Sequence, residues 1–175
     1  MNEGSLSSSM SASSVMSAFA LFGFEPALEL DESELKSRFE HLRTQFHPDR
    51  FSHGSALERR LAMQRAADIN AAYATLSKPL LRAQLYFELR GITLSEARSM
   101  DDAAFLMQQM ELREALEEAH DTQTRQKLRQ QIQQLWSQSW QALCPTSIEA
   151  QADASLIQRE LQRLQFLQRF LEQMD

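Results

Sequence analysis

A single proline between two helical patterns constrains the fold of this chain most strongly. The apolar residues before this proline recur at the spacing of one helical face: Leu35, Phe39, Leu42 and Phe46. Pro48 disfavours helical geometry at His47, so the first helix must end near Phe46. A second apolar stripe runs from about residue 56 to residue 76. Together the two patterns predict an antiparallel helical hairpin joined by an exposed loop.

The remaining sequence is also helical in pattern, and we predict an all-α fold. Glycine and proline number only four each, a scarcity that long helices tolerate and tightly turned sheets do not. Near the hairpin we expect a short helix over 17–22, a linker over 25–30 and a helix from Pro79 to about residue 90. Three further patterns predict an antiparallel three-helix bundle: residues 102–119, 122–143 and 148–173, the last with a capping box of Thr146 and Glu149.

These patterns divide the chain into four predicted segments. We expect a Ser-rich tail at 1–15, a hairpin domain at 16–91, a linker at 92–100 and a helical bundle at 101–175. The tail lacks both the basic start of a secretory signal and the arginines of a transit peptide. We therefore interpret it as disordered, with a later start of translation at Met10 or Met16 left open.

Composition and spacing argue against several classes of function. A net charge of −6 repels phosphate backbones, so we expect no nucleic-acid partner. One cysteine excludes an intramolecular disulfide, and no apolar run is long enough to span a bilayer. The histidines lack zinc-site spacing, and no Gly-rich phosphate loop occurs. We expect neither an enzyme nor a bound cofactor or metal.

The tripeptide His47-Pro48-Asp49 is the strongest candidate for function. Proline stiffens the loop, so His47 and Asp49 are presented in a set orientation at low entropic cost. A carboxylate held in this way is a good target for an arginine of another protein. The alternative is an ordinary turn, since Pro and Asp are common turn residues.

The surrounding residues resemble the J-domain family. The matching stretches are Arg38-Phe39, Leu42, Gln45 to Phe51, Ile69 to Tyr73, and Leu76. The resemblance implies a domain that docks on the ATPase unit of a DnaK-type chaperone and stimulates ATP hydrolysis. It also implies the docking residues: Arg38, Arg43, His47, Pro48 and Asp49. Glu40 and Thr44 make the docking helix less basic than in many general J-proteins, which hints at a specialised partner.

Two apolar features of the predicted bundle do not fit its core. Leu106, Met107 and Met110 lie nearly opposite the core stripe of their helix and are flanked by glutamates. Phe166 points away from the core stripe of the last helix. An apolar patch with an acidic border is typical of a binding site, and methionine adapts to a partner's shape. Packing against the hairpin domain is the equally weighted alternative.

These features extend the resemblance to the HscB family of co-chaperones in iron–sulfur cluster biogenesis. The matching pieces include Phe105 to Met107, Met110 to Glu114, Arg82-Ala83 and Leu164 to Leu167. The resemblance implies that the bundle holds the scaffold protein IscU and that the J-domain delivers it to the chaperone HscA in a bacterial cytoplasm. It implies these scaffold contacts: Leu106, Met107, Met110, Glu111, Glu114, Glu118 and Phe166. A general J-protein that delivers unfolded clients, or a purely structural helical protein, are the alternatives.

Overall fold

The computed structural model describes residues 18–92, 102–144 and 154–174. Every regular element in these ranges is helical, so the predicted all-α fold is confirmed. The chain separates into two compact units, Met1–Gly91 and Ile92–Asp175. We call their described parts the hairpin unit and the bundle unit, and we describe each by itself.

The first long helix of the hairpin unit, α2 (Glu32–Gln45), begins and ends where local chemistry dictates. Asp31 caps it by accepting hydrogen bonds from the backbone N–H groups of Ser33 and Glu34 at 2.8 and 3.0 Å. Its last turn ends at Phe46, directly before His47 and Pro48. The predicted end of this helix near Phe46 is therefore confirmed.

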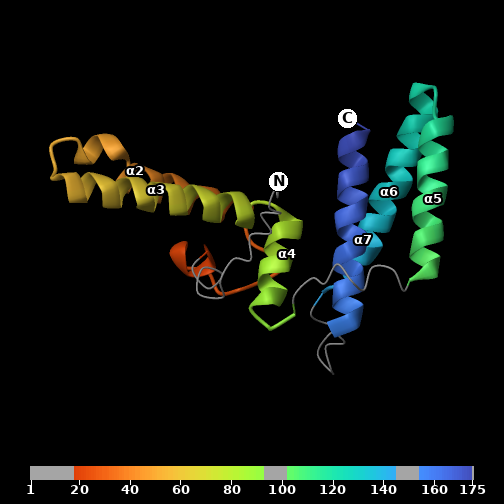
Figure 1. The fold of residues 1–175 in the computed structure, drawn as a ribbon, viewed down its shortest axis with the longest axis horizontal. Helices are drawn as coiled ribbons and strands as arrows, with labels where there is room; N and C mark the ends of the chain where they lie inside the picture. Colours follow the sequence, from red (N-terminus) through yellow and green to blue (C-terminus); the bar gives the residue numbers. More distant parts are fainter. Residues whose placement is uncertain (1–17, 93–101, 145–153, 175) are drawn as a thin grey trace, which may run out of the picture. The chain divides into compact units, whose positions relative to one another are not determined.

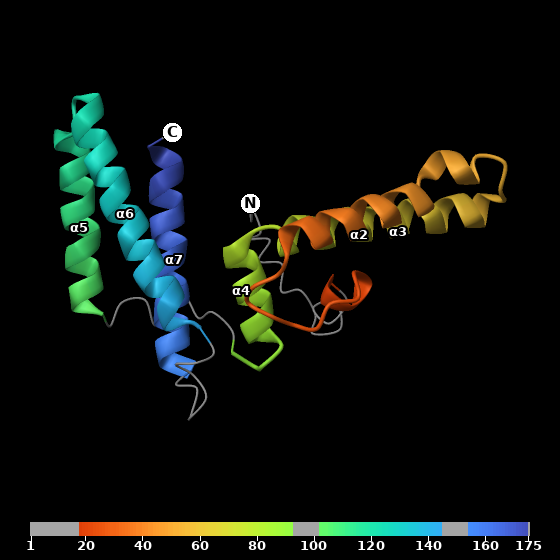
Figure 2. The same ribbon diagram turned by 180° about the vertical axis from the view of Figure 1, so that it is seen from behind.

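The second long helix, α3 (Ala56–Leu76), returns along α2 and forms the predicted antiparallel hairpin (Figures 1 and 2). Ser55 and Glu58 form a capping box that fixes its start, and their hydrogen bonds lower the pKa of Glu58. A 3-10 helix, η1 (Pro48–Phe51), lies at the tip between the two helices. Phe39 and Tyr73 stack across the hairpin with ring centroids 4.0 Å apart.

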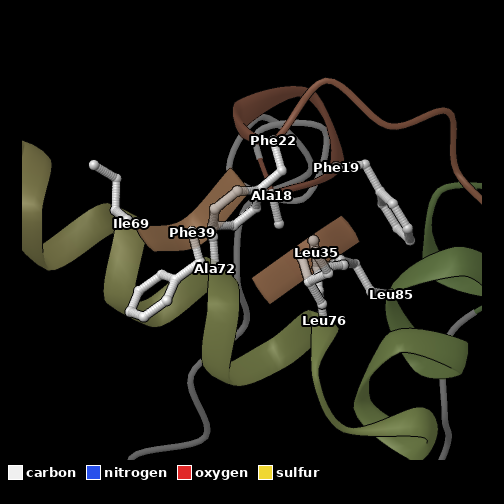
Figure 3. Packing of buried hydrophobic residues seen from close by; sticks show 9 residues of the cluster. All are labelled: Ala18, Phe19, Phe22, Leu35, Phe39, Ile69, Ala72, Leu76 and Leu85. Atoms are coloured by element: carbon white, nitrogen blue, oxygen red, sulfur yellow. The ribbon is translucent and has the colours of Figure 1, made fainter. Parts of the chain in front are cut away.

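A short helical segment at 18–21 and helix α4 (Pro79–Glu88) complete the hairpin unit. The short segment turns at Gly23, whose φ of 67° suits glycine. Its side chains join α2, α3 and α4 in one apolar core (Figure 3), whose buried members are Ala18, Phe19, Phe22, Leu35, Phe39, Ile69, Ala72, Leu76 and Leu85. In Figure 3, Leu35, Leu76 and Leu85 gather at one point of this core.

The bundle unit contains three helices, α5 (Ala103–Glu118), α6 (Thr122–Ala142) and α7 (Ala154–Gln173). Asp102 and Asp121 cap α5 and α6 through their side chains. The three helices share an apolar core, whose buried members are Leu112, Leu128, Ile132, Leu167, Phe170 and Met174. The predicted three-helix bundle is confirmed for these ranges.

Several predictions concern residues outside the described ranges. The Ser-rich tail at 1–15 and nearly all of the linker at 92–100 fall there, as do Thr146 and Glu149 of the predicted capping box. The predicted start of the last helix at residue 148 also lies there, and the described part of α7 begins at Ala154.

Candidate functional site

The tip of the hairpin is held by its own backbone. Pro48 occupies the first turn of η1, where its missing N–H costs nothing. His47 precedes it as the cap, and its Nδ1 accepts a hydrogen bond from the Asp49 backbone N–H at 3.3 Å. The Arg50 N–H donates to the His47 carbonyl at 3.0 Å, and the Ser52 N–H donates to the Asp49 carbonyl at 3.3 Å. These bonds make the tip a short, closed turn.

The polar side chains of this turn face solvent. The His47 side chain is 53% exposed and the Asp49 side chain is 90% exposed. The His47 Nδ1 and Asp49 Oδ2 atoms are 3.5 Å apart. The predicted exposure of the tripeptide is therefore confirmed, and both groups can reach a partner without any unfolding.

The tip rests on residues that belong to the core of the hairpin. Phe46 is half-buried against that core, and the guanidinium of Arg65 on α3 lies over its ring at 5.8 Å. Arg50 and Arg59 reach back to carbonyls of the same region, those of Thr44 and Ser52, each at 3.5 Å. The exposed tripeptide is thus carried on a supported loop, as recognition loops commonly are.

The two arginines of the predicted docking set differ in their surroundings. Arg38 is half-buried and donates hydrogen bonds to the carbonyls of Phe22 and Gly23. It also pairs with Glu34 and lies over the Phe24 ring at 4.1 Å. Arg38 therefore ties the short N-terminal segment to α2, a structural role that the sequence does not reveal. Its docking role stays a prediction.

Arg43, in contrast, stays at the surface. Its side chain is exposed and pairs with Glu40 one helical turn earlier, with Nη2 2.8 Å from Oε2. Its guanidinium lies 5.6 Å from the centre of the Phe39 ring. A surface ion pair of this kind contributes little to stability, so Arg43 can exchange Glu40 for a carboxylate of another protein.

The second candidate surface lies on α5. Leu106, Met107 and Met110 are exposed, Met107 by 64%. The predicted apolar face is therefore confirmed as exposed within the described residues. Glutamates at the border of the face are exposed as well: Glu111, Glu114, Glu117 and Glu118. We call this combination the α5 face. It offers apolar area surrounded by negative charge.

The helical wheel points Phe166 away from the core stripe of the last helix, but the structure gives it aromatic neighbours within its own bundle. It is half-buried in its own bundle, where it meets Phe105 edge-to-face with centroids 5.7 Å apart. Phe170 lies beside it at 5.6 Å. The wheel misplaces Phe166 because α7 packs against two helices at once, so its apolar arc is wider than a single stripe. Its contact with a scaffold stays a prediction.

A charged group inside the bundle is not among the candidate residues named from the sequence. Glu160 is 5% exposed, and its carboxylate lies 3.1 Å from Nη1 of Arg163. Arg163 also donates to Asp102 at 2.9 Å and thereby joins α7 to the cap of α5. The signal was available, because Glu160 lies on the same helical face as Ile157 and Leu164.

Within the described ranges, no group of three histidines, cysteines, aspartates or glutamates is placed to hold a metal ion. Across the same ranges, no helix combines the length and the apolar character needed to cross a bilayer.

An antiparallel hairpin with an exposed His-Pro-Asp tip, followed by a separate helical bundle, defines a J-domain protein with a second helical unit. Residues 101–175 match the family model described as the HSCB C-terminal oligomerisation domain. A co-chaperone protein HscB homolog of Aeromonas hydrophila is 38% identical over 169 residues, which cover 91% of this chain and 95% of the relative. The chain belongs to the HscB family.

Further relatives agree with this assignment. A co-chaperone protein HscB homolog of Shewanella sp. strain ANA-3 is 45% identical over 108 residues, so that the chain matches 62% of its length. The solved structure of HscB from Vibrio cholerae superimposes with a TM-score of 0.80 at 34% identity, over 90% of this chain and 95% of that one. The crystal structure of human HscB gives a TM-score of 0.82 at 25% identity, and the match covers 90% of this chain and 79% of the human one.

Proposed function

We propose that this protein stimulates the ATPase of a DnaK-type chaperone, HscA, and delivers the iron–sulfur scaffold IscU to it. The observation that carries the proposal is the tip, where a proline-stiffened turn presents His47 and Asp49 to solvent. Membership of a family whose named relatives are co-chaperones supports the same function. The bacterial relatives favour a bacterial cytoplasm as its place of action.

The tip supplies the contact with the chaperone. The Asp49 carboxylate can accept a two-pronged pair of hydrogen bonds from an arginine of the ATPase unit. Pro48 and the η1 hydrogen bonds keep the carboxylate in place before the encounter, which lowers the entropy lost on binding. Arg43 adds a positive charge on the same hairpin, about one helical turn before His47, the cap of η1. We therefore assign docking to the tip and to Arg43.

The bundle supplies the contact with the scaffold. Leu106, Met107 and Met110 can bury apolar area, and the glutamates around them favour a partner with a basic surface. Because the two surfaces lie on separate units, one protein can hold the chaperone and its cargo together. The iron–sulfur cluster travels with the scaffold and is not a cofactor of this chain.

Steady-state ATP hydrolysis by HscA tests the tip directly. We expect Asp49→Asn to abolish stimulation, because the neutral amide cannot replace the carboxylate in the arginine contact. Asp68→Asn is the matched control, since Asp68 is an exposed aspartate of α3 that accepts a bond from Gln64. Scaffold binding should be unchanged in both variants. Equal stimulation by the wild type and by Asp49→Asn would overturn the proposed docking role.

The exposed methionines also suit a general J-protein that carries unfolded clients. Competition separates the two functions. We expect unfolded polypeptide to displace little IscU from the wild-type protein. Efficient displacement would favour the general co-chaperone.

A further inference from the structure

A groove of about 610 Å³ opens in the bundle unit, between the first half of α5, the second half of α6 and the first half of α7. It exists because small side chains face it, with Ala104 on α5 and Ser139 and Ala142 on α6. Ser139 is buried in its wall. The groove is therefore a defined recess, which a larger side chain at position 139 would fill.

The groove is continuous with the α5 face. Met107 and Glu111 belong to both, since they border the exposed apolar patch and also line the groove. A partner that covers the α5 face therefore also contacts Met107 and Glu111 at the edge of the groove. Whatever side chain this partner presents beside Met107 can enter the recess without any rearrangement of the bundle.

The charges around the groove favour a cation. Arg163 lines it, but the guanidinium is already bonded to Asp102 at 2.9 Å and to Glu160 at 3.1 Å. Two carboxylates therefore compensate its charge inside the bundle, and only its buried Nε donor has no hydrogen-bond partner among the described residues. Glu111 adds a carboxylate to the groove, and Gln108 and Gln138 add amide oxygens that accept hydrogen bonds. The remaining wall is apolar, formed by Leu135, Leu167 and Met107.

We propose that this groove receives a lysine or arginine side chain of the scaffold when the scaffold covers the α5 face. This inference rests on the proposed function and makes it more specific. The apolar walls suit the aliphatic stem of such a side chain, while the acceptors around the mouth suit its charged head. The groove would thus select a scaffold by one basic anchor, whereas the α5 face supplies general apolar contact.

Isothermal titration calorimetry with purified apo-IscU and the full chain tests the proposal. Ser139→Leu fills the groove, and Ser139→Ala at the same position keeps it open. We expect Ser139→Leu to weaken binding about tenfold or more and Ser139→Ala to bind like the wild type. Gln138→Trp narrows the mouth from an exposed position, so it tests the groove without altering the core. Circular dichroism checks that each variant is folded.

A double-mutant cycle tests the charge of the occupant. Glu111→Gln should weaken binding severalfold, and it should add little once Ser139→Leu has excluded the side chain. The proposal of a basic occupant would be overturned if the effects of Glu111→Gln and Ser139→Leu on binding were additive. It would also be overturned if Glu111→Gln had no effect on binding. Unchanged affinity of both Ser139→Leu and Gln138→Trp would overturn the groove itself.

The same titrations separate this inference from the proposed function. Leu106→Ala and Met110→Ala lie on the α5 face and do not line the groove. If they weaken binding while the groove variants do not, the scaffold binds the α5 face without an anchor. If they also bind like the wild type, scaffold binding by the α5 face is wrong.

Discussion

Replacing Arg82 with methionine should destabilise the hairpin unit more than most single changes of a polar residue. Arg82 is only 4% exposed, and its Nε donates to the carbonyl of Leu28 at 2.8 Å. Its Nη1 donates to the carbonyl of Leu76 at 2.5 Å. One guanidinium therefore joins the segment before α2 to the end of α3. Methionine is similar in length but leaves both carbonyls without this donor.

The expected loss in the free energy of unfolding follows from these two hydrogen bonds. A hydrogen bond from a charged donor contributes about 1.5–3 kcal/mol, so the pair contributes about 3–6 kcal/mol. Burial lowers the pKa of Arg82, although Glu32 and Glu29 oppose the shift, so holding the charge in place costs free energy. Methionine relieves that cost, on the order of 1–2 kcal/mol. We expect a net loss of about 1–5 kcal/mol in the free energy of unfolding.

Urea unfolding followed by far-ultraviolet circular dichroism measures this loss, and hydrogen exchange localises it. Amides of α2 and α4 should exchange faster in Arg82→Met, while those of α6 serve as an internal reference. Arg59→Met is the control, because Arg59 is exposed and makes one long bond of 3.5 Å. The control should change stability by less than about 0.5 kcal/mol. If Arg82→Met also changed the free energy of unfolding by less than about 0.5 kcal/mol, the assigned role of Arg82 would be refuted.

Three further predictions concern stability. The Phe105 N–H and then Arg163 lower the pKa of Asp102. The charged Asp102 side chain therefore contributes its full stabilisation of the folded protein above the ordinary aspartate pKa. This stabilisation is lost as the pH falls through the lowered pKa. Asp102→Asn should remove this dependence of stability on acid pH. Tryptophan fluorescence measures it, because Trp136 and Trp140 report on α6. A pH profile of Asp102→Asn equal to that of the wild type would contradict this prediction. In urea unfolding, Arg38→Met should lower the free energy of unfolding by about 1 kcal/mol, whereas Arg43→Gln should leave it almost unchanged. Equal losses for the two variants would contradict the different surroundings of the two arginines. Phe166→Ala should destabilise the bundle by about 1–3 kcal/mol, more than Met110→Ala, and the reverse order would contradict the contact with Phe105.

Features governed by neighbouring residues could be predicted from the sequence. The bounds of α3 and the end of α2 before Pro48 both depend on side chains within about one turn. The exposure of Leu106, Met107 and Met110 followed from the helical period, because they lie opposite the core stripe. The same local rules placed His47 and Asp49 on an exposed loop.

Features that join distant segments could not be predicted in this way. The bond from Arg82 to the Leu28 carbonyl depends on how the chain before α2 meets α4, which no periodicity encodes. The burial of Glu160 depends on Arg163 and Asp102 meeting across two helices. Phe166 illustrates the same limit, since a single wheel cannot show that α7 packs against two neighbours.

The proposed function requires one chain to present a rigid acidic tip to a chaperone and a separate surface to that chaperone's cargo. The most direct test is the ATPase rate of HscA with this protein alone, with IscU alone, and with both. The two proteins together should raise the rate by more than the sum of their separate effects. A rate equal to that sum, or no stimulation by the wild-type chain, would contradict the account.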